Sequence, residues 1–184
     1  MKNSIISKEA IIKASRSIAL NRGIRVISIR GVASECGVSI GSIYNYFPSK
    51  ADLMAATIED IWKSIFHVAG RCSELKRFDQ CIRWIYESIV KGIEEYPDFF
   101  VNHWVGFDSS EKKTGRKVME KYFSHIKNGM MSVLESDGTV ELTVFDDDFT
   151  KDSFIDFVFT NILTTAISKK ENCEYLINLI AKII

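Results

Sequence analysis

Residues that could perform catalysis or bind a metal are present in this chain, but not in the patterns that those tasks require. The chain has three histidines and four cysteines: His67, His103, His125, Cys36, Cys72, Cys81 and Cys173. They form no C-x-x-C pair and no H-E-x-x-H motif, so neither a zinc site nor a disulfide framework is expected. The acidic run 146–148 offers oxygen ligands to a hard cation, but an exposed loop before a helix explains it equally well. We therefore expect no enzyme, no metal, no cofactor, and thiols that are buried or inert.

The segment GVSIGSIYNYF, residues 37–47, could form hydrogen bonds with another molecule. The hydroxyl and amide groups of Ser42, Asn45 and Tyr46 can donate to base edges or to phosphate oxygens. Gly41 costs a helix about 1 kcal/mol relative to alanine, but it removes the side chain that would hold the backbone away from a partner. Taken singly, the tyrosines could pack on neighbouring helices and Ser39 could be an ordinary helix cap.

Helices must position these groups, because apolar residues recur at spacings of three and four along nearly the whole chain. A first helix is expected between a cap at Ser7 and a stop at Gly23, and a second between Ser28 and Gly37. A third begins after Ser39 and ends before Pro48. A fourth starts at Ser49, with Asp52 placed for a capping box, and is long enough to link two parts of the molecule.

The remainder of the chain is also predicted to be helical. Helices are expected over 82–93, 98–107, 112–135, 153–167 and 174–184, and only the stretch 139–145 alternates like a strand. No apolar run approaches the roughly 18 to 20 residues of a membrane span, and the first residues do not resemble a secretory signal. The pattern favours an all-α protein in the cytoplasm, without membrane contact.

Charge is distributed unevenly along a chain that is neutral as a whole. Residues 1–50 hold eight lysines and arginines against two glutamates, a net charge of +6, and the rest therefore carries −6. A basic head on an acidic body is the charge pattern expected when one end of a protein meets a polyanion. Two helices joined by a glycine-containing turn inside that basic segment form a helix-turn-helix pattern, whose second helix enters the major groove of DNA.

This segment resembles the DNA-binding domain of the TetR family of bacterial transcriptional regulators. The resemblance covers residues 7 to about 60 and lies in the IRGVA of the second helix, the GVS-x-GS-x-Y-x-YF of the third and the PSK before the fourth. It implies a three-helix DNA-binding domain at 1–50, a linking helix from 49, and a helical ligand-binding and dimerisation domain at 51–184. It also implies a homodimer that pairs through its last two long helices.

The resemblance carries DNA contact onto ten positions: Ser28, Arg30, Ser39, Ile40, Gly41, Ser42, Tyr44, Asn45, Tyr46 and Lys50. Ser28 and Lys50 are expected to hold phosphates at helix N-termini, and Arg30, Ser42 and Asn45 to read the sequence. Ile40 departs from the family pattern, in which this position is often basic or polar. An isoleucine can offer only an apolar contact, for example to a thymine methyl group.

An effector would bind in the acidic body of the protein. The candidate lining is aromatic and apolar: Trp62, Phe66, Trp84, Ile85, His103, Trp104, Phe107, Tyr122 and Phe123. Such a lining favours a small apolar or aromatic ligand, although each residue alone could equally be part of the core.

Together these features predict a repressor that leaves a palindromic operator when its effector binds, because a ligand that favours misplaced recognition helices must weaken DNA binding. The alternative is a regulator whose helical body binds a protein partner instead of a small molecule.

Overall fold

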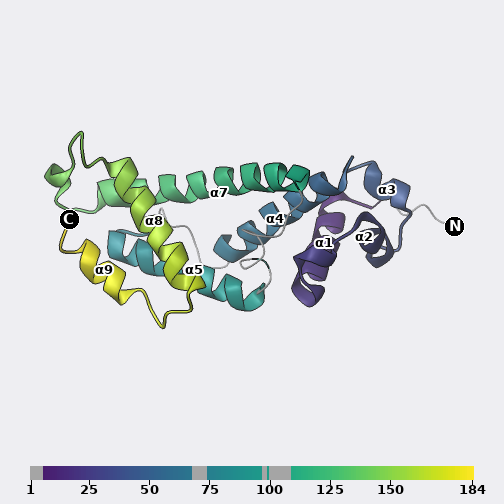
Figure 1. Cartoon of the computed structure of the whole chain (residues 1–184), viewed down its shortest axis with the longest axis horizontal. Coiled ribbons are helices and arrows are strands. Elements are labelled where there is room, and N and C mark those ends of the chain that lie inside the picture. The colour runs from purple at the N-terminus through teal and green to yellow at the C-terminus, as the bar shows by residue number, and fades with distance from the viewer. Residues whose placement is uncertain (1–5, 68–73, 97–98, 100–108) are drawn as a thin grey trace. The chain divides into compact units, whose positions relative to one another are not determined.

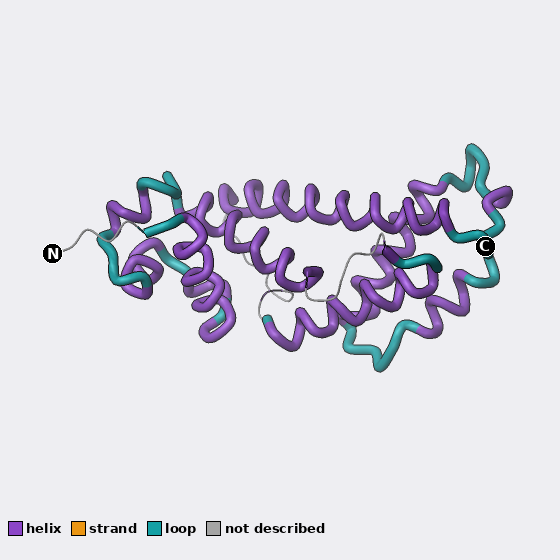
Figure 2. Tube along the Cα trace, turned by 180° about the vertical axis from the view of Figure 1, so that it is seen from behind, coloured by secondary structure: helices purple, strands orange, loops and turns teal. Residues whose placement is uncertain are grey.

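The computed structural model describes residues 6–67, 74–96, 99 and 109–184. These residues form helices and loops with no strand among them (Figure 2), so the all-α prediction is confirmed. The segment 139–145, which alternates like a strand, instead contains the 3-10 turn η3, Leu142–Val144. No helix in this described part of the chain has both the length and the apolar character needed to cross a membrane.

The helices follow the predicted order (Figure 1). They are α1 (Lys8–Arg22), α2 (Ile29–Glu35), α3 (Ile40–Tyr44), α4 (Lys50–His67), α5 (Phe78–Glu95), α7 (Ser109–Ser136), α8 (Lys151–Ile167) and α9 (Glu174–Ile180), with a 3-10 turn η1 (Ile24–Val26) between α1 and α2. The predicted helix at 98–107 lies outside the described residues, apart from Phe99. The last helix is shorter than predicted, because α9 ends at Ile180 and not at Ile184.

Serine caps start the first three helices, as predicted. The hydroxyls of Ser7, Ser28 and Ser39 each accept a hydrogen bond from the backbone N–H three residues later, at 3.1 Å in all three cases. Each bond satisfies one of the N–H groups that a helix leaves unpaired at its start. Gly23 directly follows the end of α1, and Gly37 lies in the turn after α2. Both have positive φ angles, 86° and 64°, which glycine adopts more readily than other residues.

The chain divides into two compact units. The first unit comprises residues 1–64 and 95–121, and the second comprises 65–94 and 122–184. The division falls within α4 and within α7, so each of these helices contributes residues to both units.

In the first unit, α1 packs against α2 and α2 against α3. Ile11, Val32 and Ile43 are fully buried in this small core. The buried hydroxyls of Ser15 and Thr57 share a hydrogen bond of 2.7 Å, which joins α1 to α4. Beside this pair, the next residue of α1, Arg16, forms an ion pair at 3.3 Å with Asp60, which lies three residues after Thr57 on α4. Within this unit α4 is therefore joined to α1 by two polar contacts.

In the second unit, a buried carboxylate ties the start of α5 to the end of α7. Asp137 is only 6% exposed and accepts hydrogen bonds from the Phe78 backbone N–H (2.8 Å) and from the Thr139 backbone N–H (2.9 Å) and hydroxyl (2.7 Å). Burial alone would raise the pKa of Asp137, but these hydrogen bonds outweigh it, so the pKa lies below its ordinary value. The contact with Phe78 crosses 59 positions of sequence.

The cysteines differ from the prediction at one position. Cys81 takes part in a disulfide bond, so the expectation of free thiols is wrong for this residue. Cys36 and Cys173 are free, and burial raises the pKa of both thiols. Spacing along the chain does not show which cysteines meet in space, which is why the sequence did not reveal the bond.

Candidate functional site

The surface of α3 and its flanking residues is the candidate nucleic-acid interface. Six of the predicted contact residues in this segment are exposed: Ser39, Ile40, Gly41, Tyr44, Asn45 and Tyr46. Ile43 and Phe47 are buried and Val38 is half-buried on the side that packs on the other helices, as predicted. The exposed face therefore combines a glycine, short polar groups and two tyrosine rings.

Gly41 is not required by the fold. It has an ordinary helical backbone, and among the described residues a Cβ at this position would approach only the Ser39 hydroxyl, at 3.7 Å. Glycine at this position therefore makes the helix less stable than alanine would, although an alanine side chain would not clash with any described residue. What it provides is a stretch of helix surface with no side chain on it.

Hydrogen bonds already engage three of the predicted contact residues in this segment, Ser39, Ser42 and Tyr46. The hydroxyls of Ser39 and Ser42 lie 2.9 Å apart, and Ser39 also caps α3. Ser42 is half-buried, so of this pair the Ser39 hydroxyl is the more accessible. The Tyr46 hydroxyl donates to the backbone carbonyl of Ile6 at 2.6 Å.

The remaining predicted contacts flank α3. Ser28 is half-buried and caps α2, and Gly31 leaves room for that cap, because a Cβ there would lie 3.0 Å from the Ser28 Oγ. Arg30 is exposed in the first turn of α2, and Lys50 is exposed at the first position of α4. Ser49 caps α4 by accepting the Asp52 N–H at 3.2 Å and donating its hydroxyl to the Asp52 carboxylate at 2.7 Å.

The predicted effector residues fall into different groups. In the second unit, the Phe66 ring lies 5.6 Å from that of Trp84 and 6.0 Å from that of Tyr122, so these three residues do meet. Phe123 packs against Phe159 of α8 at 5.0 Å. Three further candidates, His103, Trp104 and Phe107, lie outside the described residues.

The other two predicted effector residues are buried. Ile85 of α5 is fully enclosed in the second unit, and Trp62 belongs to the first unit, where it packs edge-on against Phe99 at 5.3 Å.

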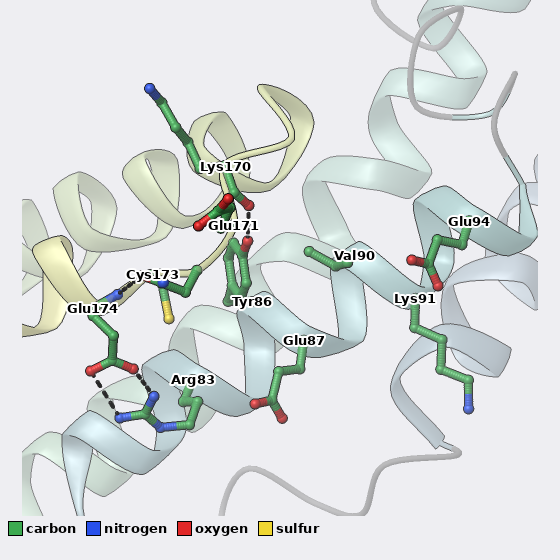
Figure 3. Close-up of a pocket in the computed structure, with 11 residues that line it drawn as sticks. Arg83, Tyr86, Glu87, Val90, Lys91, Glu94, Lys170, Glu171, Cys173 and Glu174 are labelled. Carbon is green, nitrogen blue, oxygen red and sulfur yellow. Dashed lines mark hydrogen bonds and ion pairs between the residues drawn. The ribbon is translucent and has the colours of Figure 1, made fainter.

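A pocket of about 510 Å³ lies between α5 and the α8–α9 connection, within the second unit (Figure 3). Arg83 of α5 forms a two-pronged ion pair with Glu174, and the Tyr86 hydroxyl donates to the backbone carbonyl of Lys170. The pocket is lined by Arg83, Tyr86, Glu87, Val90, Lys91, Glu94, Lys170, Glu171, Asn172, Cys173 and Glu174. None of the predicted effector residues is among them, and the lining is charged where an apolar one was expected.

Comparison with known proteins places the helix-turn-helix in a known family. Residues 11–57 match the model of the tetR family of bacterial regulatory proteins. A Bacillus subtilis protein described as an uncharacterised HTH-type transcriptional regulator, YerO, is 40% identical over 52 residues. That match covers 28% of this chain and 18% of the relative, so it supports a likeness over a short part of each protein only.

Solved structures resemble nearly the whole chain in fold. FadR from Bacillus subtilis in complex with stearoyl-CoA has a TM-score of 0.65 at 13% identity, covering 96% of both chains. RolR in complex with resorcinol has a TM-score of 0.64 at 16% identity, covering 96% of this chain and 86% of RolR. The multidrug binding protein EbrR with proflavin has a TM-score of 0.63 at 15% identity, covering 96% and 98%. At these identities the likeness shows a common fold.

Proposed function

We propose that this chain, whose residues 11–57 match the model of the tetR family of bacterial regulatory proteins, binds a palindromic operator as a homodimer and represses transcription until a small apolar or aromatic effector releases it. The observation that carries the DNA-binding part is the exposed face of α3. It presents bare backbone at Gly41 beside the exposed Asn45 and Tyr44, and the fold itself has no need of that glycine.

The proposed contacts divide into those that position the protein and those that read bases. Lys50, at the start of an 18-residue helix, meets a phosphate with both its ammonium group and the helix N-terminus. Ser28 and Tyr44 contact phosphates beside it in this proposal. Arg30 and Asn45 are exposed donors suited to base edges.

Ser39, Ile40, Ser42 and Tyr46 complete the proposed interface. Ile40 is 39% exposed and offers its apolar side chain to the groove. The Ser39 hydroxyl, as the more accessible of the bonded serine pair, is better placed than Ser42 to reach DNA.

The small-molecule part of the proposal is supported by the aromatic cluster of Phe66, Trp84 and Tyr122 in the second unit. Clustered rings suit flat or apolar ligands. FadR, RolR and EbrR were crystallised with stearoyl-CoA, resorcinol and proflavin, each of which contains an acyl chain or an aromatic ring. Tryptophan fluorescence during titration with such compounds tests this part, because Trp84 lies in the cluster.

Selection of bound duplexes from a random library, at stated salt, tests the DNA-binding proposal. A recovered motif with two inverted half-sites separated by about one helical turn supports a dimeric operator binder. Failure to enrich any motif, with protein freed of bound ligand by unfolding and refolding, would contradict the proposal.

The homodimer is supported by apolar side chains that α8 and α9 leave exposed. Phe157 is 47% exposed, Tyr175 83% and Leu179 37%. We expect Phe157→Lys to raise the dissociation constant of the dimer at least about tenfold, because a charge would be buried in the interface. Sedimentation velocity over a concentration series measures this. Leu20→Lys, at a similarly exposed position in the first unit (44%), should leave dimerisation unchanged. Equal dissociation of both variants would show that α8 is not the interface.

A further inference from the structure

Two contacts fasten the start of α1 to the end of the recognition helix. The Tyr46 hydroxyl donates to the Ile6 carbonyl at 2.6 Å, across 40 positions of sequence. Two residues after Ile6, the Lys8 ammonium lies over the Phe47 ring, 5.5 Å from its centre. Both contacts lie within the first unit, so the geometry belongs to one compact body.

Lys8 keeps its hydrogen-bonding capacity in this position. A cation over a ring face is held by the ring quadrupole, which leaves its N–H groups able to meet an acceptor. The side chain is exposed, and no ion pair joins Lys8 to any residue that the structure describes. Hydrogen bonding with its own backbone N–H and with Ser7, and to a smaller extent the charge of Lys8, hold the pKa of the neighbouring Glu9 carboxylate below its ordinary value.

The placement of Lys8 gives the interface a second ammonium group near the end of α3. Phe47 directly follows Tyr46, and Lys50 begins α4 three residues later. Lys8 of α1 thus lies against the segment that leads into α4, and Lys50 is the first residue of α4. Two ammonium groups so placed suit neighbouring phosphates of one DNA strand.

We infer that Lys8 is a further phosphate-contacting residue and that Tyr46 positions it by holding the Ile6 carbonyl. This inference rests on the proposed operator binding. It also assigns Tyr46 a role different from direct phosphate contact, since its hydroxyl proton is already donated to a backbone carbonyl. Phe47, buried beneath Lys8, supplies the ring on which the ammonium rests.

The test measures affinity for the selected palindromic duplex as a function of salt concentration. Lys8→Ala should reduce the slope of log K against log salt by about 0.9 per subunit, equivalent to about fivefold weaker binding per subunit at 0.15 M salt. Tyr46→Phe keeps the ring and removes only the hydroxyl. If the Tyr46 hydroxyl acts by positioning Lys8, its loss should weaken DNA binding only while Lys8 is present. The double variant Lys8→Ala/Tyr46→Phe should therefore bind the duplex no more weakly than Lys8→Ala alone. Lys13→Ala removes the same charge from an exposed position of the same helix and should leave the slope unchanged.

Each outcome bears on a separate claim. An unchanged slope in Lys8→Ala, with wild-type protein still binding the duplex, would overturn the phosphate contact and leave the proposed function intact. Additive losses in the double variant would overturn the positioning role of Tyr46. If wild-type protein bound no duplex, the proposed function would fail and this inference with it. Far-ultraviolet circular dichroism confirms that each variant is folded before binding is compared.

Discussion

Gly41→Ala is expected to bind the operator at least about tenfold more weakly and yet to be more stable than the wild-type protein. Alanine is favoured over glycine in a helix by about 1 kcal/mol. Since the added methyl group would meet only the Ser39 hydroxyl, at 3.7 Å, nothing inside the described part of the chain offsets that gain. On the DNA side, the methyl would stand between the helix backbone and the groove. A loss of tenfold corresponds to about 1.4 kcal/mol of binding free energy.

The two effects of Gly41→Ala are measured separately. Urea unfolding should give a free energy of unfolding about 0.5 to 1 kcal/mol above the wild-type value, and fluorescence anisotropy gives the affinity for the duplex. Gly138→Ala is the matched control, because Gly138 is exposed and a Cβ there would meet no described atom within 4 Å. It should leave DNA binding unchanged. A Gly41→Ala protein with unaltered affinity would show that this face of α3 does not approach DNA closely.

Asp137→Asn is expected to lower the free energy of unfolding by about 1 to 3 kcal/mol at neutral pH. One carboxylate oxygen accepts the Phe78 N–H, and the other accepts the Thr139 N–H and hydroxyl. An asparagine side chain has one acceptor oxygen and one NH₂ donor. Its NH₂ group would therefore point at an N–H or O–H donor on one of the two sides. The start of α5 or the turn after α7 would then lose a buried hydrogen bond. Asp147→Asn, in the exposed acidic loop, should change stability by less than about 0.5 kcal/mol.

The same carboxylate predicts how stability changes with acid. The pKa of Asp137 is lowered in the folded state, so its contribution is fully present above the unfolded value of about 4 and is lost as the pH falls through the folded pKa. The difference in unfolding free energy between wild type and Asp137→Asn should therefore shrink below about pH 4. Urea titrations at pH 7 and at about pH 3 measure it. A difference that stays constant would mean that the carboxylate charge contributes nothing to stability.

The first unit could be predicted from sequence because its signals are local. The caps at Ser7, Ser28 and Ser39 each act over three residues, and the structure has all three hydrogen bonds. The inward side of α3 follows in the same way from helical spacing, since Ile43 and Phe47 are four residues apart. Helix starts and faces depend on neighbours in sequence, and those neighbours are visible without a structure.

The second unit was harder to predict because its contacts join distant positions. Nothing in the sequence around Asp137 indicates that Phe78 lies beside it. Phe123 is one of the residues predicted to line an effector site, yet its ring packs on Phe159 of α8. Apolar spacing shows which face of a helix is buried, but it does not show which partner helix covers that face. The charged pocket beside Arg83 and Glu174 left no local signal for the same reason.

The hydrogen bond between Ser15 and Thr57 bears on how far α4 would have to tilt for an effector to displace the DNA-binding helices. With α1 and α4 joined by that buried bond and by Arg16–Asp60, the helix-turn-helix must turn together with the first part of α4. An 18-residue helix is about 27 Å long, so a tilt of only about 5° displaces one end by about 2 Å relative to the other. Hydrogen bonds to bases tolerate only a few tenths of an ångström of stretching. In the proposed function, a rotation of a few degrees, without any helix unfolding, would therefore be enough to switch operator affinity.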